Sequence, residues 1–209
     1  MRGFAIAGIG TDVGKTVVSA IITEALEGCY FKPIQAGDLD NSDSTKVRNW
    51  CSDKIIVSEE RFKLQAPMAP HKAAELDGIE LRLEDIEFPK TDQPLILEGA
   101  GGVLVPLNEK GETILDVYKK SKLPIILVSR HYLGSINHTL LTIKAIQAAG
   151  LQLAGIIYVG DASEHTEEII EKLTKVKTFG RVPIAEEVNS TFIQQQANAF
   201  KHLVYELNR

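Results

Sequence analysis

The amino-acid sequence predicts an α/β fold in which a mostly parallel central sheet carries helices on both faces. Short apolar runs of strand length alternate with helical patterns along the chain, which is typical of consecutive βαβ units. Several of these runs are continuously apolar, as expected for strands buried on both faces. The chain of 209 residues is long enough for one good hydrophobic core. We therefore expect a single domain over residues 1–209.

The expected elements follow one another in a regular order. Apolar runs predict strands at residues 4–7, 29–31, 94–98, 123–128, 153–159 and 179–183. Helical patterns predict helices at 14–26, from about 44 onward, near 73–74, and at 114–120, 134–149, 164–174 and 189–207. Gly28 is expected to end the first helix and Ser135 to cap the helix that runs to residue 149. Residues 77–92 are polar, and we interpret them as an insertion over one face.

A glycine-rich segment, GIGTDVGKT at residues 8–16, joins the first strand to the first helix. Backbone N–H groups of such a loop point inward, and the helix N-terminus adds about half a positive charge, so the loop favours phosphate. Lys15 can reach the outer phosphates, and the Thr16 hydroxyl can hold Mg²⁺. The segment therefore predicts the P-loop NTPase fold, with the loop as its nucleotide site.

This segment departs from the strict P-loop pattern, G-x-x-x-x-G-K-[ST], whose first glycine would fall on Ile9. Gly8 comes one residue earlier, and Gly10 lies inside the loop. The alternative is a glycine-rich turn between a strand and a helix with an incidental lysine. Glycine, lysine and threonine together at this junction favour nucleotide binding over that alternative.

Three further side chains come from other parts of the chain. Lys32 follows the strand at 29–31, at the sheet edge where open α/β sheets bind ligands, although an exposed lysine at a strand end is the commoner case. Asp43 either caps the helix near residue 44 or meets a metal ion, and the spacing leaves both open. Glu98 ends a buried strand before four small residues, as a metal-directed carboxylate of P-loop enzymes does; a hairpin-like turn is the alternative. With the loop, they suit phosphoryl transfer from a magnesium nucleotide.

Composition and charge argue against several other classes of protein. The net charge is −5 with no long block of like charge, so we expect neither nucleic acid nor an anionic membrane as a partner. No apolar run has the length of a membrane span, and the N-terminus lacks the layout of a secretory signal, so we expect a cytoplasmic protein. Cys29 and Cys51 have no metal-ligand spacing, and we expect reduced thiols.

Several blocks of the sequence resemble the dethiobiotin synthetases of biotin biosynthesis, almost from end to end. The blocks are GTDVGKT at 10–16, KPIQAG at 32–37, NSD at 41–43, LEGAGG at 97–102 with VPL following, and GSINH at 134–138. The segment LQLAG at 151–155 and the turn at Val182 and Pro183 also fit. Several blocks in the right order are much more specific than a P-loop alone.

The resemblance implies an ATP-dependent ring closure in a homodimer. One amine of 7,8-diaminopelargonic acid is carboxylated by CO₂ (with bicarbonate as its source), and the carbamate takes the γ-phosphate to form a mixed anhydride. The second amine then attacks the carbonyl, which closes the ureido ring and releases phosphate. The chemistry is consistent, because a carbamate oxygen is a poor leaving group until it is phosphorylated.

The resemblance also implies roles for the matching positions. Lys32 corresponds to the catalytic lysine, and Lys15 lies on the reacting phosphate. Thr16, Asp43 and Glu98 correspond to the Mg²⁺ ligands. Ala36 and Asn137 correspond to substrate contacts, and Asn137 serves the neighbouring subunit by receiving the substrate carboxylate. The nucleotide-binding positions are Asp12, Val13, Gly14, Lys15, Thr16, Val17, Asp43, Glu98, Gly99, Ala100, Gly101, Pro183, Ile184 and Ala185.

Three departures from the family pattern change our expectations. Ile9 and Gly10 replace a threonine–aspartate pair. Ala36 stands where some members carry a serine near the substrate, so that hydroxyl contact is missing or supplied by backbone. Val159 and Gly160 stand where the family has the asparagine–aspartate pair that reads the base. We therefore expect weak discrimination among nucleoside triphosphates.

Other P-loop proteins fit the sequence less well. The partition and septum-placement ATPases, the main alternative, carry a signature lysine five residues before the P-loop lysine, and that position is Gly10 here. Amidotransferases that act on cobyrinic-type acids need a glutaminase domain, for which no residues remain. The presence of Lys15, Lys32 and Glu98 argues against a scaffold without turnover.

Overall fold

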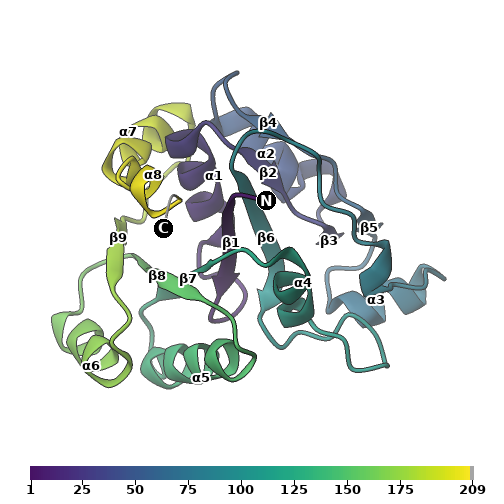
Figure 1. Ribbon diagram of the computed structural model, residues 1–209. Coiled ribbons are helices and arrows are strands. Elements are labelled where there is room, and N and C mark those ends of the chain that lie inside the picture. The colour runs from purple at the N-terminus through teal and green to yellow at the C-terminus, as the bar shows by residue number, and fades with distance from the viewer. Residues whose placement is uncertain (208–209) are drawn as a thin grey trace.

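A seven-stranded sheet forms the centre of the protein in the computed structural model, which describes residues 1–207 (Figure 1). The strands are β1 (Gly3–Gly8), β2 (Cys29–Phe31), β4 (Ile56–Val57), β6 (Leu95–Gly102), β7 (Ile125–Arg130), β8 (Leu153–Val159) and β9 (Thr178–Val182). Their order in space is β4-β2-β6-β1-β7-β8-β9. Each neighbouring pair is parallel, so the expected parallel sheet is confirmed.

Helices cover both faces of this sheet, as expected. The helices are α1 (Lys15–Leu26), α2 (Asp43–Trp50), α3 (Pro70–Leu76), α4 (Ile114–Ser121), α5 (Ser135–Ala148), α6 (Glu164–Thr174), α7 (Ser190–Phe200) and α8 (Leu203–Glu206). Helices α1, α2 and α7 contact one another above the sheet in Figure 1, and α5 contacts α6 below it. None of the helices in the described part of the chain is long and apolar enough to span a membrane.

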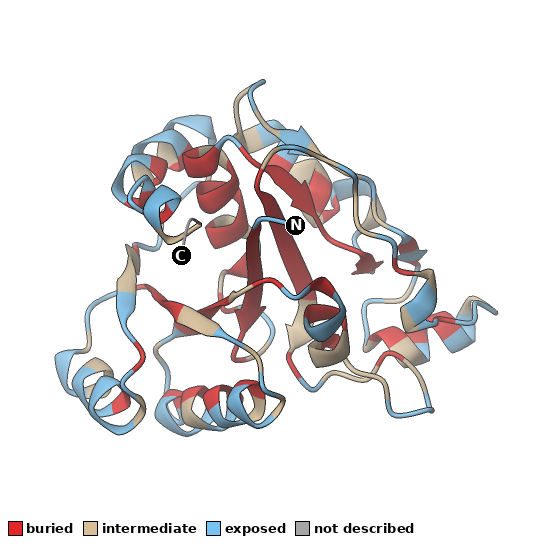
Figure 2. Ribbon diagram, in the orientation of Figure 1, coloured by how far each residue is buried: buried red, intermediate tan, exposed pale blue. Residues whose placement is uncertain are grey.

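The core lies between these two helix layers. Every residue of β1 is buried, and Figure 2 shows the central strands as the main buried region. Parallel strands between helix layers have no solvent-facing side, which explains why they appear in the sequence as continuous apolar runs. Helix α1 follows β1 directly and is itself largely buried, because it packs between the sheet and α7.

Three short strands were absent from the sequence prediction. Strand β4 lies at the edge of the main sheet, and β3 (Ile34–Ala36) pairs with β5 (Phe62–Leu64) in a separate two-stranded sheet. Each is only two or three residues long. Such strands carry no detectable alternation, because they are held by pairing and packing rather than by an intrinsic pattern.

Gly28 does not end α1 in the expected way. The helix ends at Leu26, and the left-handed residue after it is Glu27, with φ of 47°. A Cβ atom at Gly28 would lie 2.7 Å from the carbonyl oxygen of Pro94. Glycine is required here because the chain enters β2 against the start of β6, not because of the helix end.

The expected helix at 189–207 is two helices. Helix α7 ends at Phe200, and the amide groups of Val204 and Tyr205 bond to carbonyls three residues earlier, which marks a tighter turn. Phe200 and Leu203 are both buried. The prediction was wrong because the amphipathic pattern continues across the break, while packing of both residues against the core requires the backbone to turn.

The polar segment at 77–92 packs against the body of the protein beside α4. Leu81 and Ile86 are buried. Lys120 of α4 donates to the carbonyl oxygens of Leu83 and Glu84 at 2.9 and 3.0 Å. Apart from a single 3₁₀ turn at Leu83–Asp85, the segment has no regular structure, which explains why its sequence pattern was uninformative.

Candidate active site

The glycine-rich segment forms a closed loop between β1 and α1. Gly14 has φ of +93°, and a Cβ atom at Gly8 would lie 2.8 Å from Cδ of Lys15 and 2.9 Å from Cγ2 of Val13. The loop therefore folds back over the end of β1, where only glycine fits. Lys15 Nζ donates to the carbonyl oxygen of Gly10 at 2.8 Å, across the loop. This geometry supports a P-loop whose leading glycine is Gly8.

Glu98 lies beside the loop because β6 is paired with β1. The pairing places Glu98 opposite Ile6, two residues before the end of β1. Thr16 Oγ1 donates to Glu98 Oε1 at 3.0 Å, and the Glu98 side chain is completely buried. The carboxylate thus lies at the first turn of α1 rather than in a hairpin-like turn.

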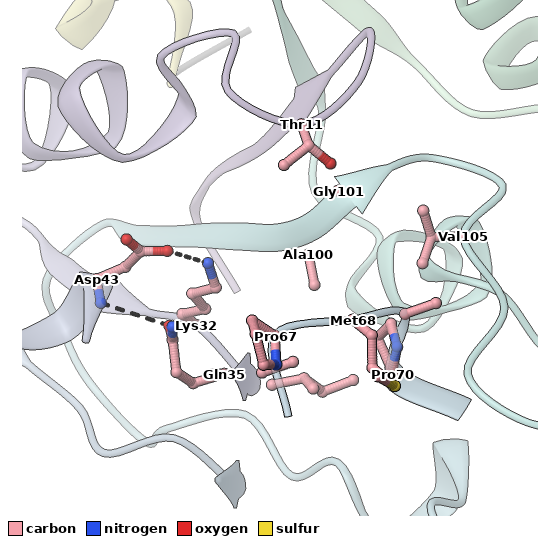
Figure 3. Close-up of a pocket in the computed structure, with 13 residues that line it drawn as sticks. Thr11, Lys32, Gln35, Asp43, Pro67, Met68, Pro70, Ala100, Gly101 and Val105 are labelled. Atoms are coloured by element: carbon pink, nitrogen blue, oxygen red, sulfur yellow. Dashed lines mark hydrogen bonds and ion pairs between the residues drawn. The ribbon is translucent and has the colours of Figure 1, made fainter. Parts of the chain in front are cut away.

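Lys32 reaches the same carboxylate from the other side of β6, because it directly follows β2. Its Nζ lies 3.4 Å from Glu98 Oε1 and forms its closest hydrogen bond with Asp43 Oδ2 (Figure 3). Only 9% of the Lys32 side chain is exposed. Lys32 is therefore not the exposed strand-end lysine that the spacing alone favoured, and one ammonium bridges two carboxylates.

Asp43 is the first residue of α2, and its neighbour Ser42 is the cap. The Ser42 hydroxyl accepts the Thr45 amide at 3.3 Å, which leaves the Asp43 carboxylate free to face Lys32. The Asp43 amide donates to Gln35 Oε1 at 3.4 Å. Of the two sequence interpretations of Asp43, the capping role belongs to Ser42.

The charges in this cluster stabilise one another. Burial alone would lower the pKa of Lys32, but the Glu98 and Asp43 carboxylates outweigh it and hold that pKa above its usual value. Burial likewise would raise the pKa of Asp43, but the Lys32 ammonium holds it below its usual range. Burial lowers the pKa of Lys15, against the opposing effect of Glu98. Lys32 and Asp43 are therefore a charged pair at neutral pH.

A cavity of about 410 Å³ opens beside this cluster (Figure 3). Lys32, Gln35 and Asp43 lie together at its polar end, and Thr11 lines it beside Gly101. The rest of its wall is formed mostly by apolar side chains: Ile34, Ala36, Pro67, Met68, Ala69, Pro70, Ala100 and Val105. The site can therefore hold a molecule with a charged end and an aliphatic chain.

The small residues after Glu98 divide between two environments. Ala100 and Gly101 line the cavity, whereas Gly99 faces α4, where a Cβ atom would collide with the Tyr118 hydroxyl. Gly99 is therefore kept small by packing against α4 and does not line the cavity. Strand β6 also continues through Gly102, beyond the predicted end at residue 98.

The segment after β9 and the end of β8 lie near the helix end of the P-loop. Val159 packs against Gly14, since a Cβ there would lie 3.2 Å from both Val159 methyl groups. Pro183 and Ile184 are exposed, Ala185 is partly buried, and Ile184 adjoins Gly160. This region thus offers apolar surface beside the nucleotide loop.

Asn137 lies outside the cavity. It is exposed in the first turn of α5, whose N-cap is Gly134 with φ of 102° rather than Ser135 as expected. Ser135 is the first residue of the helix, and no side-chain hydrogen bond caps this N-terminus. Asn137 is not among the side chains that line the cavity.

Sequence reasoning missed Tyr30, which it assigned only to an apolar strand. The Tyr30 hydroxyl donates to Glu98 Oε2 at 3.0 Å, and burial together with the Glu98 charge raises the pKa of this phenol well above its usual value. Tyr30 stands two residues before Lys32, and residues two apart share a face in extended chain. That spacing was the available signal.

The donors around Lys32 fit a magnesium ion bound together with a nucleotide. Thr16, Asp43 and Glu98 supply hard oxygen donors, and the place between the two carboxylates already holds a cation, the Lys32 ammonium. No cluster of three or more His, Cys, Asp or Glu that could hold a metal occurs within residues 1–207. Mg²⁺ does not need one, because it commonly binds one or two carboxylates plus phosphate oxygens and water.

We predict that Lys32→Met lowers the free energy of unfolding at pH 7 by about 3 kcal/mol, because the buried Glu98 carboxylate and the partly buried Asp43 carboxylate lose their cation. Without the ammonium, burial of Asp43 is no longer offset and the pKa of this carboxyl rises, so the variant regains stability as the pH falls from about 8 to about 5. Urea denaturation across this range measures the effect. The control is Lys54→Met, which removes the exposed Lys54–Glu27 pair and should have little effect at any pH. Equal stability of Lys32→Met and wild type would contradict the prediction.

Solved structures support the fold. The cell division ATPase MinD of Pyrococcus furiosus matches with a TM-score of 0.61 at 14% identity, covering 97% of this chain and 100% of that chain. A ParA family ATPase from Chlorobium tepidum TLS matches with a TM-score of 0.52 at 15% identity, covering 100% and 92%. At such low identity the likeness concerns the fold alone, and the expected P-loop NTPase fold is confirmed.

The sequence itself has much closer relatives. A family model described as an AAA domain matches residues 2–191. The ATP-dependent dethiobiotin synthetase BioD of Christiangramia forsetii is 49% identical over 207 residues, which is 99% of each chain. The BioD protein of Rhodopseudomonas palustris (strain CGA009) is 38% identical over 192 residues, covering 90% of this chain and 89% of that protein. The chain therefore belongs to the dethiobiotin synthetase family.

Proposed function

We propose that this protein closes the ureido ring of dethiobiotin from 7,8-diaminopelargonic acid, CO₂ and ATP, with Mg²⁺ as the metal and in the cytoplasm. The main observation in support is that the Lys32 ammonium group lies next to both the P-loop and the cavity. Lys32 lines the cavity and also faces the carboxylate that Thr16 holds. A group phosphorylated at the P-loop therefore lies at the polar end of a cavity that fits an aliphatic chain.

The nucleotide is held by the P-loop and the start of α1. Backbone N–H groups of Asp12 to Val17 and the helix dipole face the phosphates, and Lys15 moves from the Gly10 carbonyl to the phosphate oxygens. Thr16, Asp43 and Glu98 would hold Mg²⁺, which would supply positive charge to the phosphate oxygens of the bound nucleotide. Ala100 and Gly101, which line the cavity, contact the diamine through their backbone.

The diamine lies along the cavity with its amines at the polar end. One amine nitrogen attacks CO₂ and loses a proton, which gives a carbamate anion; Lys32 neutralises its oxygens. A carbamate oxygen then attacks the γ-phosphorus, and the bond to ADP breaks. The second amine attacks the carbonyl carbon and loses a proton, the C–O bond to phosphate breaks, and the leaving phosphate carries that proton away. Lys32 stabilises the charge that develops in each step.

We predict that Lys32→Ala leaves binding of the magnesium nucleotide nearly intact and lowers turnover by about a hundredfold or more, since one charge contact in the transition state is lost. Glu98→Gln weakens the dependence on Mg²⁺ instead. Isothermal titration with magnesium nucleotide, followed by phosphate release with and without the diamine, measures both effects. Unchanged turnover in Lys32→Ala would remove Lys32 from the mechanism. Phosphate release at the same rate with and without the diamine would overturn the proposed reaction.

The base of the nucleotide lies against Val159, Gly160 and the segment from Pro183 to Ala185. Val159 has no hydrogen-bonding side chain, and its methyl groups face Gly14. Arg181 Nη1 already donates to the carbonyl oxygens of Gly160 and Asp161, at 3.2 and 2.9 Å. Few polar side-chain groups therefore remain at this end to distinguish one base from another.

We predict that ATP, GTP and CTP support turnover with kcat/KM values within about a hundredfold of one another, because a site without a matched hydrogen-bonding side chain discriminates weakly. Phosphate release in the presence of the diamine, measured for each nucleotide, provides the test. A preference for ATP above that range would show that backbone groups or Ile184 read the base.

We also propose that the protein is a homodimer whose subunits meet near the start of α5. Leu104, Leu133, Ile136 and Leu141 are exposed on or beside this helix, and an apolar patch of this kind marks an interaction surface. Leu104 and Leu141 also line a shallow groove. Asn137 lies within this patch, where it can receive the carboxylate of a substrate bound in the other subunit's cavity.

The dimer is tested by complementation. We predict that a heterodimer of Lys32→Ala and Asn137→Ala chains, isolated through two different tags, has about half the wild-type activity at low diamine concentration, because one of its two sites is intact. Each homodimer is impaired at both sites. A heterodimer no more active than its parents, or a monomer in sedimentation equilibrium, would contradict the arrangement.

A further inference from the structure

We propose that Tyr30 is a positioning residue that fixes Glu98 so that Oε1 alone faces the metal and Lys32. The proposal rests on the proposed function only in assigning Glu98 to the Mg²⁺ site. Tyr30 is not among the residues that line the cavity, and its hydroxyl donates to Glu98, so it acts through that carboxylate.

The sheet register explains how the phenol reaches the carboxylate. Tyr30 is paired with Ile96 across β2 and β6, so the two side chains lie on the same face of the sheet. Ile96 and Glu98 are two residues apart on β6 and share that face as well. The tyrosine side chain is long enough to extend past Ile96 to Glu98, and its hydroxyl lies 3.0 Å from Oε2.

The two oxygens of Glu98 have separate partners. Oε2 accepts from Tyr30, whereas Oε1 accepts from Thr16 at 3.0 Å and from Lys32 at 3.4 Å. Both Tyr30 and Glu98 are completely buried, so their hydrogen bond is shielded from solvent. A carboxylate held at one oxygen presents the other as a single ligand, which suits the strict octahedral geometry of Mg²⁺ better than the larger Ca²⁺.

The experiment compares Tyr30→Phe with Tyr118→Phe. Tyr118 is also completely buried, and its hydroxyl donates to the backbone carbonyl of Ile6 at 2.9 Å. Each variant thus removes one buried phenol hydroxyl from the region of β6, but only Tyr30→Phe removes a bond to Glu98. Both variants are first compared with wild type by thermal unfolding without nucleotide.

The readout is the dissociation constant of ADP without metal, with Mg²⁺ and with Ca²⁺, by titration calorimetry. Tyr30→Phe is expected to leave the affinity for ADP without metal unchanged. It should reduce the increase in ADP affinity that Mg²⁺ produces by about tenfold or more, and the increase that Ca²⁺ produces by less. Tyr118→Phe should leave all three constants unchanged. In a Glu98→Ala background, Tyr30→Phe should have no further effect on the gain from Mg²⁺.

Several results would overturn the proposal. Tyr30 would have a packing role only if Tyr30→Phe reduced ADP affinity equally with and without metal, or if both tyrosine variants reduced it equally. The same would follow if Tyr30→Phe kept its full effect on ADP affinity in the Glu98→Ala background. These constants are measured without the diamine. If the wild-type protein binds magnesium nucleotide but its phosphate release does not respond to the diamine, the proposed reaction is refuted. The test of Tyr30 remains valid in that case.

Discussion

The arrangement of the site depends on one buried negative charge, the carboxylate of Glu98. A carboxylate removed from water is costly unless its charge is compensated and its oxygens accept hydrogen bonds. Thr16, Tyr30 and Lys32 supply those bonds from the first turn of α1, from β2 and from the residue after β2. The requirement to satisfy this charge ties the P-loop to the strand on the far side of β6. The glycine-rich loop and the cavity therefore adjoin each other at this carboxylate.

The strand order makes this convergence possible. Strand β6 lies between β2 and β1, and the carboxyl ends of parallel strands meet at one edge of the sheet. The residues that follow β1 and β2 thus flank the end of β6. Polar contacts are dense at this edge, around the phosphate end of the site. They are sparse near Val159 and Ile184, where apolar side chains adjoin the loop.

Much of the fold was predictable because its signals are local. Strand β8 and helix α6 have the predicted bounds, since a buried apolar run and an amphipathic pattern are properties of the segments themselves. Other features depended on neighbours distant in sequence. The short strands β3, β4 and β5 exist through their pairing, and Gly28 is required by the approach of Pro94 rather than by the helix end. Tyr30 was assigned only to an apolar strand, because its hydrogen-bond partner lies on another strand.

The sequence by itself determined the fold class, the phosphate loop and the family. Each of them depends on short continuous segments, and the order of residue types within a segment is enough to indicate a strand, a helix, a phosphate-binding turn or a family motif. Tertiary structure alone decided which distant groups meet. The capping role of Ser42, the outward position of Asn137, and the contact of Thr16, Tyr30 and Lys32 with one carboxylate all follow from the pairing of β6 with its two neighbours and from helix packing. Strand order is set by the packing of the whole sheet, and no local pattern encodes it.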